Sequence, residues 1–96
     1  MYCKTHETGG SRVLACADEN VLGKTFSGKD IEVTVKESFY RGEKIGEERL
    51  AELLKEHDSI NLFGEKSVGV AVKQGLLSGK DIIRIQGVMH AIILKV

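Results

Sequence analysis

Two cysteines and three histidines of this chain could bind a soft metal ion, and the cysteines could act as nucleophiles. Cys3 and His6 have the Cys-x-x-His spacing of a zinc ligand pair, and Cys16 could supply a second thiolate. A structural zinc ion takes four ligands, however, and residues three apart on a strand point to opposite faces. We therefore expect no metal and interpret both cysteines as small buried core residues.

A cysteine nucleophile beside His6 or His90 would be a different use of the same residues. A reactive thiol needs an electropositive and partly exposed environment, whereas both cysteines occur in strand-like segments. We therefore assign no catalytic residue and expect no cofactor. His90 follows the segment 87–89 and is expected in a loop between two apolar strands, where its imidazole could hydrogen-bond a neighbouring loop or a ligand.

The segment 61–67 is a second candidate site, because a short strand ends and a helix begins at Gly64. Backbone amides in the first turn of a helix can hold an anion, and Lys66 and Ser67 could assist. The segment lacks the Gly-x-x-x-x-Gly-Lys-Ser/Thr loop of nucleotide hydrolases, and Glu65 would repel a phosphate. The alternative is a tight turn in which Glu65 and Ser67 support the start of the helix.

The third candidate is the run Phe39-Tyr40-Arg41-Gly42, which holds two of the five aromatic residues. We expect it to extend or leave the strand before it, so that Phe39 and Tyr40 face opposite ways. One ring would then enter the core, and the other could stack on a nucleobase beside Arg41. The alternative is one core ring and one partly exposed ring with no ligand.

Charge is unevenly distributed along the chain although the net charge is zero. Residues 31–60 contain eight acidic and five basic residues, a net charge of −3, and residues 61–96 contain two acidic and five basic residues, a net charge of +3. A basic C-terminal third could bind phosphate, although strong nucleic-acid binders usually carry a net basic excess.

The longest apolar run, 91–94, is too short to span a membrane, and no signal-peptide core is visible. We therefore expect a soluble cytoplasmic protein with reduced cysteines and no membrane association.

Periodicity and glycines indicate the elements that position these residues. Gly9 and Gly10 between two strand-like segments predict a hairpin in which Cys3 lies opposite Cys16 as a non-hydrogen-bonded pair. The predicted strands are 1–7, 11–17, 31–36, 60–63, 82–86 and 91–96, and the predicted helices are 46–57 and 65–77. A helical turn is predicted at 18–23, with Asp18 as its cap. Gly75 is expected on the buried stripe of the second helix.

The order β-β-β-α-β-α-β-β predicts a single α+β domain over residues 1–96. We expect a two-layer sandwich with both helices on one face of a mixed or mostly antiparallel sheet of five to six strands. A chain of this size has a thin core, which favours a shallow groove or a partner surface over a deep active-site cavity.

Four segments, in order along nearly the whole chain, form a recognisable pattern: Tyr2–Glu7, Phe39–Gly42, Asn61–Val68 and Gly87–Ala91. Together they resemble a small archaeal family known as domain of unknown function 424. The resemblance implies an archaeal cytosolic protein with an α+β fold and no established activity, and family context suggests an association with translation. In relatives the residue before the histidine of the last segment is more often proline, whereas here it is Met89, which implies a less rigid loop at His90.

Three functions are consistent with these features. The leading hypothesis is a non-catalytic module that binds RNA or a ribonucleoprotein, based on the basic C-terminal third and on Phe39, Tyr40 and Arg41. The second is a protein-interaction subunit or homodimer that pairs through residues 91–96, if this apolar strand lies at an edge of the sheet. The third is a small ligand-binding protein or enzyme centred on His90, His6 and the strand–helix junction at Gly64.

Overall fold

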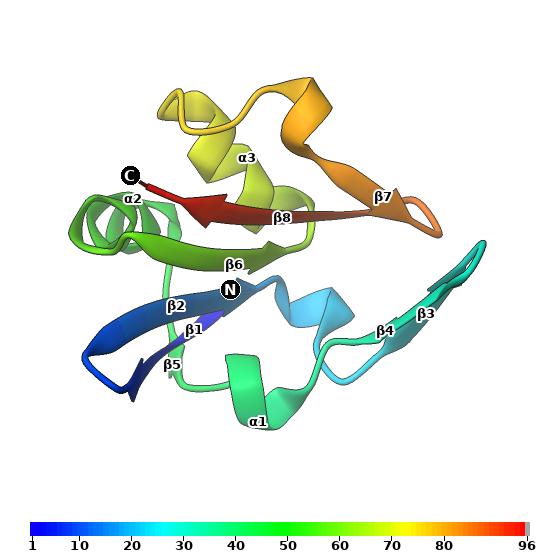
Figure 1. The fold of residues 1–96 in the computed structure, drawn as a ribbon, viewed down its shortest axis with the longest axis horizontal. Coiled ribbons are helices and arrows are strands. Elements are labelled where there is room, and N and C mark those ends of the chain that lie inside the picture. Colours follow the sequence, from blue (N-terminus) through cyan, green and yellow to red (C-terminus); the bar gives the residue numbers. More distant parts are fainter. Residues whose placement is uncertain (96) are drawn as a thin grey trace.

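A six-stranded mixed sheet forms the centre of the protein in the computed structural model, which describes residues 1–95 (Figure 1). The strand order is β5-β1-β2-β6-β8-β7. The strands are β1 (Tyr2–Thr8), β2 (Ser11–Ala17), β5 (Glu43–Lys44), β6 (Ser59–Phe63), β7 (Ile83–Ile85) and β8 (Val88–Leu94). Only β2 and β6 pair in parallel within this sheet. The predicted α+β class and mixed sheet are confirmed.

The β1–β2 hairpin has the predicted turn and register. Gly9 and Gly10 both have positive φ angles, 54° and 84°, as a two-residue type I′ turn requires. The pairing places Cys3 opposite Cys16, which confirms the register expected from the two glycines.

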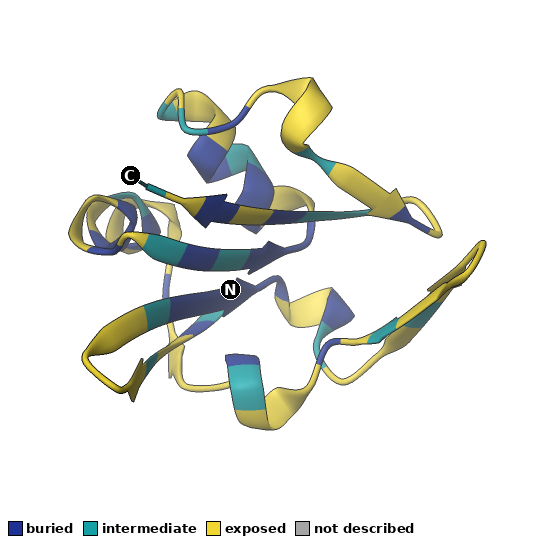
Figure 2. Ribbon diagram, viewed as in Figure 1, coloured by how far each residue is buried: buried dark blue, intermediate teal, exposed yellow. Residues whose placement is uncertain are grey.

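Two helices, α2 (Glu47–Glu56) and α3 (Glu65–Lys73), pack on one face of the sheet. Their buried stripes meet alternate residues of the strands in a core that includes Leu14, Cys16, Leu50, Leu54, Ile60, Leu62, Val68 and Ile93 (Figure 2). The position of both helices on one face agrees with the prediction. The predicted end of α3 at residue 77 is wrong, because the helix ends at Lys73 and Gly75 adopts a φ of 75°. Gly75 follows the end of the helix and is not part of its buried stripe.

The second face of the sheet is only partly covered. The hairpin of β3 (Thr25–Gly28) and β4 (Ile31–Thr34) and the single turn α1 (Glu37–Tyr40) pack against β2 and β6. A smaller core forms there from Ala15, Ala17, Val35, Tyr40, Phe63 and Ile85. Of the two courses expected for Phe39 to Gly42, extension of the strand is wrong and departure from it is right, since β4 ends at Thr34 and Glu37 to Tyr40 form a helical turn.

The C-terminal hairpin differs most from the prediction. Gln86 and Gly87 form its turn with φ angles of 52° and 79°, so β8 begins at Val88 and His90 lies within the strand. The loop expected around His90 is therefore wrong. Strand β8 is also only partly at the edge of the sheet, because β7 follows it in the strand order and pairs with Val88 to His90. Val96, the last residue of the predicted strand, lies outside the described residues.

Two short 3₁₀ turns complete the chain, η1 (Glu19–Val21) and η2 (Gly79–Asp81). Asp18 precedes η1 but makes no side-chain capping bond to it, so the predicted cap is wrong. Among residues 1–95, no helix has both the length and the apolar character needed to cross a membrane.

Candidate functional site

The side chain of Asp18 closes the N-terminus of α3 instead of capping η1. Its carboxylate accepts hydrogen bonds from the backbone N–H groups of Lys66 and Ser67, both at 2.8 Å, and from the Ser67 hydroxyl at 2.7 Å. The carboxylate thus takes the place that an external anion would occupy at a helix N-terminus. Of the two interpretations of this junction, the structure favours the turn that supports the helix start, with Asp18 rather than Glu65 as the acceptor.

Gly64 is required at this junction by its neighbour and by its backbone conformation. Its φ is 107°, and a Cβ atom there would lie 2.3 Å from Cγ of Asp18. Its N–H donates to the carbonyl of Met89 at 2.8 Å. The glycine therefore lets β2, β6 and β8 converge where α3 begins.

A pocket of about 470 Å³ lies beside the junction, at the carboxyl ends of the parallel strands β2 and β6. Its lining includes Glu19, Asn20, Gly64, Glu65, Lys66, Gly87 and Met89. The pocket therefore contains two of the predicted site residues, Gly64 and Lys66, and does not include His90 or His6 in its lining. Three carboxylates, from Asp18, Glu19 and Glu65, line the pocket beside the side-chain ammonium group of Lys66, so the lining does not favour an anionic ligand.

The imidazole ring of His90, on β8, contacts two residues of the neighbouring strand β6. The Nδ1 atom lies 2.9 Å from the carbonyl oxygen of Leu62 and donates to it, and the ring stacks on Phe63 with centroids 4.3 Å apart. Burial lowers the pKa of His90 below its usual value, because the charged form loses hydration. The imidazole of His90 therefore packs on the second face of the sheet, where burial favours its uncharged form.

His6 makes equivalent contacts elsewhere on the sheet. Its Nε2 atom lies 2.7 Å from the carbonyl oxygen of Phe39, and the two rings stack at 4.5 Å. Following the strand pairings, His6 and His90 are three strands and four residues apart, a separation of about 20 Å. The two imidazoles do not converge on one site.

The aromatic run at α1 is engaged within the protein. Tyr40 is buried, which raises its pKa to about 12, and its ring meets Phe39 edge to face at 5.0 Å. Arg41 forms an ion pair with Glu37 and lies 5.2 Å from the ring of Tyr2. One ring is therefore in the core and the other is partly exposed, as the second interpretation of this run expected.

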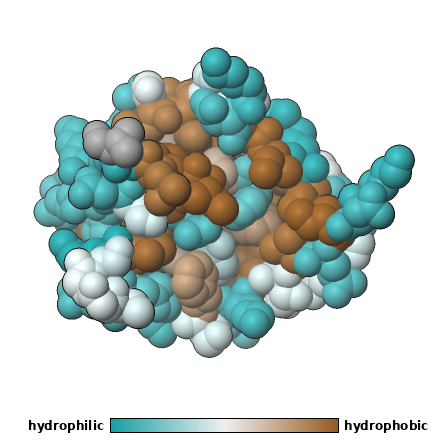
Figure 3. All heavy atoms as spheres, viewed as in Figure 1, coloured by the Kyte–Doolittle hydropathy of each residue, from teal (hydrophilic) through white to brown (hydrophobic). Residues whose placement is uncertain are grey.

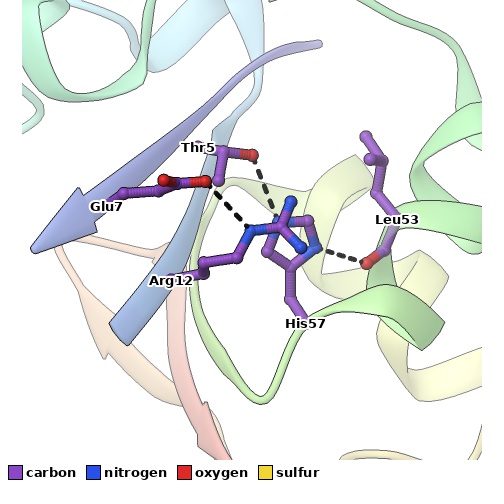
Figure 4. A network of polar contacts seen from close by, with 5 residues as sticks. All are labelled: Thr5, Glu7, Arg12, Leu53 and His57. Atoms are coloured by element: carbon purple, nitrogen blue, oxygen red, sulfur yellow. Dashed lines mark hydrogen bonds and ion pairs between the residues drawn. The ribbon is translucent and has the colours of Figure 1, made fainter. Parts of the chain in front are cut away.

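His57 connects α2 to the hairpin. The residue follows the last turn of α2, and its Nδ1 donates to the Leu53 carbonyl at 2.8 Å, while Nε2 lies 3.2 Å from the Thr5 hydroxyl (Figure 4). Since Nδ1 carries the proton, Nε2 accepts from Thr5. Both ring nitrogens are satisfied within the protein, so His57 serves the packing of α2 on β1.

The edge considered for residues 91–96 is present in part, as the open half of strand β8. Strand β7 pairs only with Val88 to His90, so residues 91–94 have no strand on that side within residues 1–95. The bonds from Gly64 N–H to Met89 and from Lys95 N–H to Asp58 show that odd-numbered residues of β8 face β6. By alternation, the N–H and C=O groups of Ile92 and Leu94 point to the open side.

The side chains of these residues form an exposed apolar strip, which we define as Ile83, Ile92 and Leu94. Their exposed fractions are 55%, 57% and 72%. The three residues share the second face of the sheet, because Ile83 pairs with His90, which alternates in phase with Ile92 and Leu94. Figure 3 shows hydrophobic residues gathered where β8 lies in Figure 1. No local pattern in the sequence marks this strip, because residues 82–86 were expected to form a strand nearly as long as its partner, 91–96.

Comparison with known proteins agrees with the fold described above. A crystal structure of an uncharacterized conserved protein from the archaeon Methanopyrus kandleri is similar, with a TM-score of 0.77 and 31% sequence identity. The similarity covers 99% of this chain and 92% of that one. No curated protein matches the chain. The model of a family described as a protein of unknown function, DUF424, matches residues 6–96, and the chain therefore belongs to the DUF424 family.

Proposed function

We propose that this protein is a non-catalytic interaction module that associates through the open half of β8, and that its partner there is a second copy of the same chain. The observation that carries the proposal is the coincidence of two features at Ile92 and Leu94. Their backbone groups point to an unpaired side of the sheet, and their side chains are largely exposed. An unprotected apolar edge of this kind is a template for strand pairing.

The geometry of this edge is self-complementary. The two outward-pointing residues are separated by one residue, Ile93, so a two-fold axis through Ile93 would place Ile92 opposite Leu94 of the second copy. Each such pair exchanges two backbone hydrogen bonds in an antiparallel ladder. Symmetry then repeats the pair, as an isologous interface requires. One arrangement thus satisfies all the outward backbone groups of both residues.

Charge does not oppose this pairing. The apolar strip contains no charged residue, and the ammonium group of Lys95 is directed to the carbonyl of Leu54. Native edges are commonly protected by an exposed lysine, and here the nearest lysine is turned away. Because the strip is small, the interface would fall near the low end of specific interfaces, about 1,200 Å² in total. Dimerisation should therefore be reversible and depend on concentration.

Binding to RNA, the leading hypothesis from the sequence, has less support from the local geometry. Asp18 occupies the helix N-terminus that could have held a phosphate. Arg41 is paired with Glu37, and Lys44 with Glu19 at 3.3 Å. A salt titration of binding to single-stranded RNA addresses this alternative, because phosphate contacts give an affinity that falls steeply with salt.

Light scattering over a range of protein concentrations tests the proposed association. We expect the weight-average mass to rise from that of a monomer toward that of a dimer, with the backbone amides of Ile92 and Leu94 gaining protection from hydrogen exchange at high concentration. A mass that stays monomeric at millimolar concentration would overturn the proposal.

A further inference from the structure

Cys3 and Cys16 are directly opposite each other on β1 and β2, with both side chains in the core beneath α2 and α3. The two-residue turn at Gly9 and Gly10 makes Thr8–Ser11 a hydrogen-bonded pair, so alternation makes Cys3–Cys16 a non-hydrogen-bonded pair. Cα atoms in such a pair are about 4.5 Å apart, within the range of about 4.4–6.8 Å found in disulfides. A bond between the two sulfur atoms therefore requires no change of register.

Only Cys3 of this pair can be reached from solvent. It is 7% exposed and lies at the wall of a pocket of about 370 Å³, whereas Cys16 is completely buried. The same pocket is lined by three basic side chains, Lys4, Arg12 and Arg49, and two acidic ones, Glu43 and Glu56. The three basic and two acidic side chains leave this lining with an excess of one positive charge, so a small disulfide with carboxylate groups, such as cystine, could approach Cys3 there.

We propose that Cys3 and Cys16 are a dithiol that closes to an intramolecular disulfide by exchange with a low-molecular-weight disulfide that enters at Cys3. The Cys3 thiolate attacks one sulfur of the small disulfide, forming a mixed disulfide and releasing one small thiol. The Cys16 thiolate then attacks the Cys3 sulfur and displaces the second small thiol. The protein loses two protons and two electrons, and the bond of the small disulfide is reduced to two thiols.

The buried position of both groups controls the rate of this exchange rather than its outcome. Burial raises the pKa of the Cys3 thiol, although the charge of Arg49 opposes this, and burial raises the pKa of Cys16 to about 12. Thiolates are therefore scarce at neutral pH, and closure should be slow and should accelerate with pH. The closed bond joins β1 to β2 across the Gly9-Gly10 turn, so it stabilises an element already formed.

The test uses the full chain in cystine–cysteine buffers of graded ratio, with acid quenching, alkylation and intact-mass measurement. We expect the main oxidised species to be two hydrogens lighter than the reduced protein, to resist alkylation and to be monomeric on a non-reducing denaturing gel. Its Tm should exceed that of the reduced protein by about 10 °C. A population that stops at one cysteine adduct, or that oxidises only in urea, would overturn the proposal.

Single substitutions assign the order of the steps. Cys16→Ala should stop at a mixed disulfide on Cys3, and Cys3→Ala should react at least about tenfold more slowly than the wild type, because Cys16 has no exposed surface. Equal rates for both variants would contradict the entry of the oxidant at Cys3. If either variant fails to fold, the wild-type comparison with and without urea still decides between closure in the folded state and closure after unfolding.

Discussion

Asp18 and Gly64 approach so closely that no side chain fits at position 64. A Cβ atom on Gly64 would lie 2.3 Å from Cγ of Asp18 and 2.6 Å from its Oδ2. The contact is close because the Asp18 carboxylate reaches across to the first turn of α3. The carboxyl ends of β2 and β6 and the start of α3 are thus joined at one point.

Gly64→Ala should destabilise the protein strongly. The new methyl group would meet Asp18, and the residue would keep a positive φ that alanine avoids, so we expect a loss of about 3 kcal/mol in the free energy of unfolding. Urea unfolding followed by circular dichroism measures this. The matched control is Gly69→Ala, at a helical glycine with no atom within 4 Å of a Cβ, which should be neutral or stabilise by up to about 1 kcal/mol. Equal effects at both positions would contradict the contact.

Asp18→Ala should cost about 2 kcal/mol, because it leaves the first N–H groups of α3 and the Ser67 hydroxyl without their acceptor. Hydrogen exchange should show the loss locally, as faster exchange at Lys66 and Ser67. Glu19→Ala, at the adjacent exposed residue, serves as the control and should leave exchange in α3 unchanged. An Asp18 variant with unaltered exchange at α3 would show that the carboxylate does not hold the helix.

The pH dependence of stability should include a contribution from His90. Its pKa is lowered in the folded protein, so the unfolded chain binds the proton more readily. The stability due to the neutral ring is complete above the unfolded pKa of about 6.5 and is lost as the pH falls through that value toward the folded pKa. Nuclear magnetic resonance should give a His90 titration midpoint below 6.5. His90→Gln should flatten the pH dependence of urea unfolding in this range, and a midpoint above 6.5 would contradict the burial argument.

Leu94→Lys should abolish the concentration-dependent association proposed for β8. A lysine at this position puts like charges close together in the two-fold pair, and charged side chains are a common means of blocking edge pairing. Light scattering should then give a monomer at every concentration, with the Tm at low concentration unchanged. Val72→Lys, at an exposed apolar residue of α3, is the control and should retain the association. Dimerisation that persists in Leu94→Lys would place the interface elsewhere.

Local patterns in the sequence were sufficient for several elements. Gly9 and Gly10 specify the turn and hence the pairing of Cys3 with Cys16, because a two-residue loop leaves one register. The helical spacing of Leu50, Leu53 and Leu54 located α2, since the side chains that must be buried repeat every turn. Both inferences involve residues close in sequence.

The candidate sites depended on contacts between distant segments, and here prediction was weaker. His90 was expected in a loop. Gln86 instead adopts a positive φ in the turn, and β8 begins at Val88, two residues before His90. Phe39 and Tyr40 were expected on a strand, but they pack from a helical turn against His6 and Phe63. In both cases an aromatic ring packs against a ring from another strand, a contact that local sequence patterns do not contain.

The sequence by itself determined the fold class, the first hairpin and the two helices, because turn chemistry and periodicity act over a few residues. The family followed from the resemblance of four sequence segments. The tertiary structure alone decided the parallel pairing of β2 with β6 and the open half of β8. It also decided the contact between Asp18 and Ser67, two residues that are 49 positions apart in the sequence. Asp18 has a side chain suited to any helix N-terminus. The sheet placed the start of α3, and not η1, within its reach.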